Sequence, residues 1–226
     1  MASTVFPVPP AVLAPIAGVD ATFPVRRIFC VGRNYAAHRA EMGGDDREPP
    51  FFFTKPADAL VPSGAAIPYP SATQNLHHEI ELVIAIGVGG ADIAVNDALG
   101  HVYGYAVGVD LTRRDLQAAA KAKGQPWDSA KGFDLSAPMG SIAARPGSDL
   151  KGGLSLSVNG APRQAAQLSD MIWSAPEIIA ECSRLWRLAP GDLIFTGTPE
   201  GVGPLKPGDA VHAVIDGLPA LDFRIA

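Results

Sequence analysis

Residues 77–87 read HHEIELVIAIG, and this stretch indicates the fold more clearly than any other part of the chain. From Leu82 onwards it is apolar and bounded by glycine, as is typical of a buried β-strand. Successive side chains of a strand point to opposite faces, so Glu79 and Glu81 share one face. Ile80, Leu82 and Ile84 then share the other. The stretch therefore predicts a strand with a buried apolar face and two neighbouring carboxylates.

Further short strands and a few short helices are predicted on either side of it. Strands are predicted over residues 26–32, 102–109 and 154–159, and helices over 34–42, 112–123 and 176–187. The Asn159–Gly160 pair is typical of a hairpin turn. The second helix is expected to begin at Thr112, because Thr112 and Asp115 have the spacing of a capping pair. The chain is therefore expected to form an α+β, mostly β, fold.

The composition describes a folded protein that is rich in turns. Of the 226 residues, 47% are hydrophobic and 18% are charged, which argues against intrinsic disorder. The 24 glycines and 21 prolines are typical of many turns and short strands. A net charge of −5 is unfavourable for general binding to a phosphate backbone, so no nucleic-acid partner is expected.

Cysteine usage and hydropathy exclude further classes. Cys30 and Cys182 lie far apart, which excludes a disulfide framework and a CxxC metal site. The longest apolar run, 82–88, is much shorter than the ~20 residues that span a bilayer. Residues 1–25 form a proline-rich lead-in without the basic start of a secretory signal, followed by one domain over 26–226. We therefore expect a cytoplasmic protein with no membrane partner.

Three carboxylates are candidate ligands of a divalent metal. Glu79 and Glu81 would repel each other unless a cation compensates them, although an exposed strand edge with two solvated glutamates is an alternative. Asp110 follows the strand over 102–109, where the alternative role is a helix cap. Three carboxylates suit Mg²⁺ or Mn²⁺. Lys131 would neutralise the remaining negative charge, unless it is a solvated surface residue.

Two other segments carry candidate chemistry. His38 and Glu41 are three residues apart on the predicted first helix, so the carboxylate can orient the imidazole as a general base. A solvated helix face is the alternative. Residues 191–204 form a strand followed by a glycine-rich loop, in which backbone N–H groups and the Thr198 hydroxyl could bind a carboxylate. The alternative there is a tight turn between strands.

Six segments together resemble the fumarylacetoacetate hydrolase family, and within it the small acylpyruvate and fumarylpyruvate hydrolase branch. They are CVGRNYAAH (30–38), FFTKP (52–56), NLHHEIEL (75–82), DLTRRDLQ (110–117), PWDSAK (126–131) and FTGTPEGVG (195–203). The resemblance extends from about residue 26 to the C-terminus. It implies a β-roll of mixed sheets with few helices, and a homodimer.

The resemblance also implies site residues. The metal, Mg²⁺ or Mn²⁺, matches Glu79, Glu81 and Asp110. The catalytic positions match His38, Glu41 and Lys131, and the substrate-binding positions match Arg33, Tyr35, Arg114, Gln117 and Thr198.

The activity implied is hydrolysis of a carbon–carbon bond in a 2,4-dioxo acid. Fumarylpyruvate, cleaved to fumarate and pyruvate in gentisate-type aromatic catabolism, is the first expectation. General acylpyruvate hydrolysis, oxaloacetate decarboxylation and conversion of dicarboxylic ring-cleavage products are alternatives. A hypothesis of another class is a metal-binding scaffold without catalysis, which the presence of His38, Glu41 and Lys131 disfavours.

Overall fold

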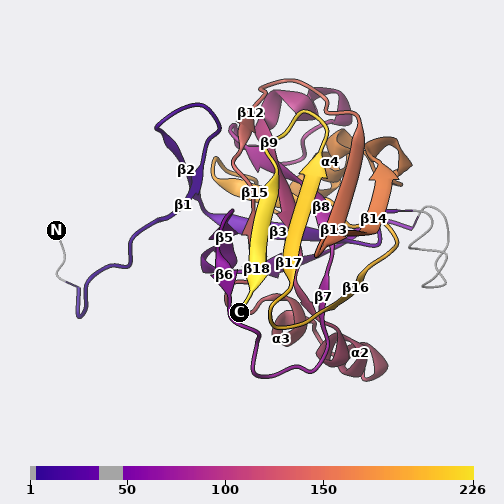
Figure 1. The fold of residues 1–226 in the computed structure, drawn as a ribbon. Coiled ribbons are helices and arrows are strands. Elements are labelled where there is room, and N and C mark those ends of the chain that lie inside the picture. Colours follow the sequence, from indigo (N-terminus) through magenta and orange to yellow (C-terminus); the bar gives the residue numbers. More distant parts are fainter. Residues whose placement is uncertain (1–3, 36–47) are drawn as a thin grey trace.

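The computed structural model describes residues 4–35 and 48–226, which form mainly β-strands (Figure 1). The strand order of the large mixed sheet is β4 (Phe51–Lys55), β3 (Arg27–Gly32), β15 (Asp192–Phe195), β8 (Ile80–Ile86), β9 (Val102–Val109), β11 (Ala137–Met139) and β5 (Leu60–Pro62), with β12 (Ala143–Ala144) paired to β9. Strands β3 and β15 are parallel, whereas β8 is antiparallel to both β15 and β9. The α+β, mostly β, prediction is confirmed.

Three smaller sheets complete the fold. One contains β14 (Ala161–Gln167), β13 (Gly153–Val158), β17 (Ala210–Ile215), β18 (Leu221–Ile225) and β6 (Ala66–Ile67). Another contains β10 (Thr112–Arg113), β7 (Leu76–His78) and β16 (Gly203–Leu205), and the last pairs β1 (Val12–Pro15) with β2 (Thr22–Val25). Asn159 and Gly160 connect β13 to β14 with φ angles of +52° and +77°, so the predicted hairpin turn is present.

Strand β8 is buried on both of its faces. Its even-numbered side chains over Ile80–Ile86 lie in the larger of two apolar clusters, and Val83 and Ala85 lie in the second. Glu79 and Glu81 are only 5% and 1% exposed, so the alternative of an exposed strand edge is wrong. The two carboxylates therefore enter the protein interior together with the strand.

Helix α4 (Ala175–Leu185) begins close to the predicted position, with Pro176 in its first turn. Ser174 and Glu177 form a capping box at its start, which satisfies N–H groups that the helix itself leaves free. The predicted helix over 34–42 falls mainly on residues that the structure does not describe. The 3₁₀ segments are η1 (Ala57–Ala59), η2 (Val95–His101) and η3 (Leu168–Asp170).

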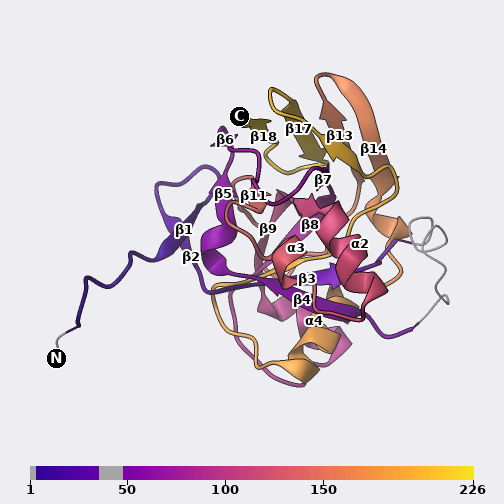
Figure 2. The ribbon, with the colours of Figure 1, turned by 90° about the horizontal axis from the view of Figure 1, so that it is seen from below.

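Helix α2 (Arg114–Ala122) starts two residues later than the capping pattern predicts. Thr112 lies in β10, opposite His77, and the Asp115 carboxylate accepts hydrogen bonds from Thr73 and from the backbone of Gln74. Partners distant in sequence have thus replaced the expected local cap. Figure 2 shows α2 beside the short helix α3 (Asp128–Lys131). Arg114 of α2 and Lys131 of α3 both contact Glu79, which directly precedes β8.

Part of the segment before residue 26 packs against the rest of the fold. The β1–β2 hairpin buries Ala14, Phe23 and Val25 against the second apolar cluster, and Ile16 pairs with Ile142. The preceding residues, from 4 to 11, are exposed and lead away from the rest of the fold (Figure 1). Over residues 4–35 and 48–226, no helix is both long and apolar enough to span a membrane.

Candidate metal centre and active site

The register of β8 and β9 brings two of the candidate ligands together. Ile80 lies opposite Val109 in this antiparallel pair, so Glu79, which precedes β8, adjoins Asp110, which follows β9. The Asp110 N–H donates to the Glu79 carbonyl over 2.8 Å. The backbone itself therefore holds these two carboxylates side by side.

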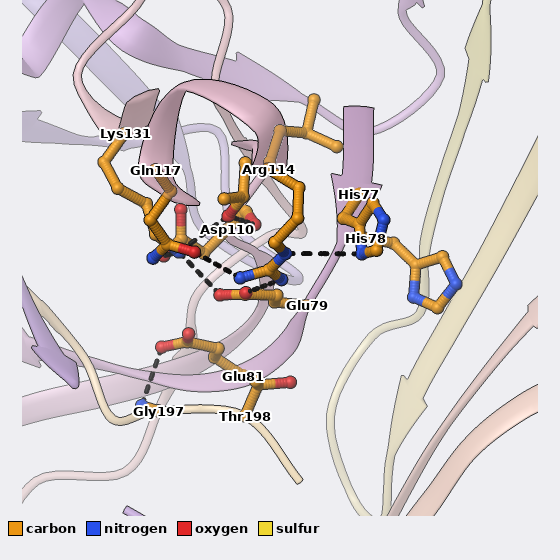
Figure 3. A network of polar contacts seen from close by, with 12 residues as sticks. His77, His78, Glu79, Glu81, Asp110, Arg114, Gln117, Lys131, Gly197 and Thr198 are labelled. Atoms are coloured by element: carbon orange, nitrogen blue, oxygen red, sulfur yellow. Dashed lines mark hydrogen bonds and ion pairs between the residues drawn. The ribbon is translucent and has the colours of Figure 1, made fainter. Parts of the chain in front are cut away.

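The third carboxylate, Glu81, lies within β8 and faces the loop that follows β15. Its Oε2 accepts a hydrogen bond from the Gly197 N–H at 2.7 Å. Ligand atoms of Glu79, Glu81 and Asp110 all lie within 4.8 Å of one another, and all three residues are buried. Figure 3 shows Glu79 between Arg114 and Glu81, with Gly197 on the far side of Glu81. The sequence-predicted triad is thus assembled in one place.

Lys131 lies in contact with this triad and not on the surface. Its Nζ is 2.6 Å from Glu79 Oε2, 2.6 Å from Asp110 Oδ2 and 2.6 Å from the Thr112 hydroxyl. The residue is 2% exposed, so the alternative of a solvated surface charge is wrong. The Asp110 carboxylate is bound by this lysine, and the helix that follows begins only at Arg114, so the capping alternative for Asp110 is wrong as well.

Two more cations approach the carboxylates. Lys55, at the end of β4 and itself 2% exposed, places its Nζ 2.8 Å from Asp110 Oδ1. Arg114, at the start of α2, donates to Glu79 and to the side-chain oxygen of Gln117. No role is predicted for Lys55 from the sequence. The only sequence feature that could have pointed to Lys55 is its position in the FFTKP segment, because no local pattern links it to Asp110.

The electrostatic environment differs sharply between the two glutamates. Burial opposes the ionisation of Glu79, but Lys131 and Arg114 outweigh it and hold the pKa of Glu79 below its usual range. Burial and the nearby carboxylates of Asp110 and Glu79 raise the pKa of Glu81 well above its usual range. Among the described residues, Glu81 has no ion-pair partner. A divalent cation would supply this missing charge, and carboxylate oxygens suit Mg²⁺ and Mn²⁺.

A cavity opens next to the triad, and most of the predicted substrate-binding residues line it. Besides the three carboxylates, its wall includes Arg33, Phe51, Phe53, Arg114, Gln117, Trp127, Lys131 and Thr198. Tyr35 is located differently: it packs in the larger apolar cluster, 2% exposed, and burial raises the pKa of its hydroxyl. His38 and Glu41 lie outside the described residues, so their roles stay predictions.

Comparison with known proteins identifies the family. Residues 27–226 match the family model for fumarylacetoacetate (FAA) hydrolase C-terminal. The chain belongs to the fumarylacetoacetate hydrolase family. It is similar to a crystal structure of fumarylpyruvate hydrolase from Pseudomonas aeruginosa in complex with Mn²⁺ and pyruvate, with a TM-score of 0.95 and 50% identity, covering 99% of both chains.

Two curated relatives in this family carry different activities. A fumarylpyruvate hydrolase of Ralstonia sp is 42% identical over 179 residues, which is 79% of this chain and 93% of the relative. The human mitochondrial oxaloacetate tautomerase FAHD1 is 42% identical over 202 residues, 88% of this chain and 91% of the relative. The family membership predicted from the six segments is confirmed. The Mn²⁺ in the Pseudomonas structure is consistent with the buried acidic triad of this chain, which is able to bind a divalent metal.

Gln164 supports the site in this family member, although no sequence pattern points to it. Its Oε1 bonds to Nδ1 of His78 at 2.9 Å and to the N–H of Ile80 at 3.1 Å. Its Nε2 donates to the Thr198 hydroxyl at 2.9 Å and to the Pro199 carbonyl at 3.0 Å. One buried amide thus joins the segment carrying the glutamates to the loop carrying Thr198.

We expect Gln164→Leu to destabilise the protein by about 1–3 kcal/mol, because it leaves buried polar groups without partners. The Mn²⁺ affinity should fall as well, since Glu79 and Glu81 flank the Ile80 N–H. Urea denaturation and calorimetric titration measure the two effects. Gln74→Leu, at an exposed position, is the control. Equal stability and equal metal affinity in both variants would show that Gln164 does not support the site.

Proposed function

We propose that this protein is a metal-dependent hydrolase that cleaves a carbon–carbon bond of 2,4-dioxo acids, with fumarylpyruvate as its preferred substrate. The charge balance at the buried triad carries this proposal. Three carboxylates face three cations, Lys55, Lys131 and Arg114, so a bound divalent metal leaves two net positive charges. Such a site favours an anionic ligand that presents a carboxylate and an adjacent keto oxygen, as a 2,4-dioxo acid does. The fumarylpyruvate hydrolases among the relatives support the choice of substrate.

In the proposed reaction, water attacks the C4 carbonyl of the substrate. His38, oriented by Glu41, takes a proton from that water while its oxygen bonds to C4. The C3–C4 bond then breaks, its electron pair moves to C3, and pyruvate leaves as an enolate. Protonated His38 returns its proton to C3 of that enolate. Fumarate is the acyl product. The bound metal supplies Lewis-acid stabilisation of negative charge on the substrate oxygens.

The residues around the cavity provide the remaining functions in this proposal. Lys131 forms ion pairs with Glu79 and Asp110 and adds positive charge beside the substrate. Gln117 accepts a hydrogen bond from Arg114 through its oxygen, so its NH₂ group can donate to a substrate oxygen. We also propose that the protein acts as a homodimer, as the resemblance to its family implies.

An ultraviolet assay of the purified protein tests the function directly. With Mg²⁺ present, fumarylpyruvate should lose its chromophore faster than acetylpyruvate, and EDTA should abolish the reaction. Re-addition of Mg²⁺ or Mn²⁺ should restore it. Turnover that persists in EDTA, or no turnover of either 2,4-dioxo acid, would contradict the proposed hydrolase.

Oxaloacetate conversion is the second candidate, and the 42% identity to mammalian oxaloacetate tautomerases favours it specifically. Decarboxylation or tautomerisation of oxaloacetate would use the same charged site without attack by water at a distal carbonyl. Turnover of oxaloacetate in an assay where both 2,4-dioxo acids are stable would favour this candidate. His38 would then need a role other than the activation of water.

A further inference from the structure

Three cationic side chains line the cavity, and one of them has no anionic partner among the described residues. Lys131 is bound to Glu79 and Asp110, and Arg114 is bound to Glu79. Arg33, by contrast, makes no ion pair within residues 4–35 and 48–226, and its buried Nε has no hydrogen-bond partner there. The cavity therefore contains a guanidinium whose charge is not needed by the metal ligands.

The backbone around Arg33 is held in an unusual conformation. Arg33 has a φ of +61°, a left-handed value that is uncommon for residues other than glycine. The next residue, Asn34, is fully buried and donates to the carbonyls of Thr196 at 2.8 Å and Trp173 at 2.9 Å. Gly197 packs so closely that an added Cβ would lie 2.7 Å from the Cβ of Asn34. This packing fixes the turn and with it the direction in which Arg33 leaves the chain.

An aromatic wall lies beside the Arg33 side chain. The Phe51 ring folds over Gly32, where an added Cβ would lie only 2.0 Å from a ring carbon. The Arg33 guanidinium carbon lies 5.7 Å from the centre of that ring, and Trp127 contacts Phe51 edge-on with ring centres 5.3 Å apart. An aromatic face positions a guanidinium and leaves its donors free for a planar anion.

We propose that Arg33 binds a second carboxylate of the substrate, so that the site selects 2-oxo acids with an anionic distal end over those with a neutral one. A guanidinium pairs with a carboxylate through two parallel hydrogen bonds, and the flat acyl arm of fumarylpyruvate would lie along Phe51 and Trp127. The proposal deepens the function proposed above and rests on it for the reaction. The binding preference itself requires no turnover.

Binding is measured first, with two ligands that lack the 4-keto group and so cannot be cleaved. Calorimetry with Mg²⁺-loaded protein compares 2-oxoheptanedioate with 2-oxoheptanoate, which differ only in the distal carboxylate. The wild type should prefer the dicarboxylate by about 10- to 100-fold, as expected for a hydrogen-bonded charge. Arg33→Gln should remove this preference and leave the affinity for 2-oxoheptanoate unchanged. Arg33→Lys should retain part of it.

Kinetics provide the second measurement. For Arg33→Gln, kcat/KM should fall about 10- to 100-fold with fumarylpyruvate, mainly through KM, and should stay within threefold with acetylpyruvate. Arg184→Gln, at an exposed position of α4, is the control and should change neither value. If Arg33→Gln does not fold, Arg33→Lys tests the proposal, because its preference for 2-oxoheptanedioate over 2-oxoheptanoate should be smaller than that of the wild type.

Equal weakening of both ligands, or no preference in the wild type, would overturn the role of Arg33. If fumarylpyruvate is not hydrolysed while the ligand preference depends on Arg33, the proposed reaction fails and the role of Arg33 stands.

Discussion

Asp110→Asn is expected to destabilise the metal-free protein by about 3–5 kcal/mol and to abolish Mn²⁺ binding. Asp110 is fully buried and contacts the Nζ atoms of Lys55 and Lys131 at 2.8 and 2.6 Å. Removing one partner of a buried ion pair leaves the other charge uncompensated, which is much more costly than losing an exposed pair. Urea denaturation in EDTA measures the stability, and Mn²⁺ titration measures the binding.

Glu81→Gln is the matched variant, because it also removes a ligand but should not destabilise the protein. Glu81 has no cationic partner among the described residues, and burial beside Asp110 and Glu79 raises its pKa. When folding raises the pKa of a carboxyl, the stability of the protein falls as the pH rises from the unfolded-state pKa of that group to its folded-state pKa. Glu81→Gln should therefore equal or exceed the wild type in EDTA at neutral pH, while losing metal binding. Equal destabilisation of both variants would contradict the assigned charge pairing.

His38→Ala is expected to lower kcat by about 10²- to 10⁴-fold, the range typical of losing a general base. Because His38 is proposed to activate water and is not proposed to bind the metal, the Mn²⁺ affinity should stay within threefold of the wild type. Steady-state kinetics with fumarylpyruvate and Mn²⁺ titration measure the two quantities.

A second histidine, outside the proposed active site, provides the control for His38→Ala. His212→Ala, at an exposed position in β17, should change neither kcat nor metal affinity. If the His38 variant binds Mn²⁺ much more weakly but keeps the wild-type kcat once Mn²⁺ is saturating, the division of roles between base and metal ligands is wrong. The same variant should retain the binding preference assigned to Arg33.

Those parts of the fold and site that depend on local pattern could be predicted from the sequence. The apolar run of β8 and its alternating glutamates indicated a buried strand with neighbouring carboxylates. Asp110 could be added because it directly follows a second apolar strand, and antiparallel pairing then places it beside Glu79. The Asn159–Gly160 turn was predictable for the same reason, because two consecutive positive φ angles favour these residues.

Features that depend on partners distant in sequence could not be predicted. Lys55 reaches Asp110, 55 positions away, only because the end of β4 packs against the end of α3, where Lys131 also contacts Asp110. Gln164 is a buried residue in a part of β14 that is otherwise exposed. The sequence of β14 therefore indicates only a surface strand and does not single out Gln164. Thr112 had the spacing of a helix cap, yet Lys131 binds its hydroxyl and β7 pairs with its backbone. Tertiary contacts replaced the local preference in each case.

The most direct test of the proposed metal centre is an anomalous difference map at the manganese edge, from crystals of the protein grown with Mn²⁺. We expect a strong peak that lies about 2.1 Å from one oxygen each of Glu79, Glu81 and Asp110. Lys131 should remain next to Glu79 and Asp110 in that structure. A peak at other residues, or no peak at the triad in saturating Mn²⁺, would contradict the metal centre and the hydrolase proposed from it.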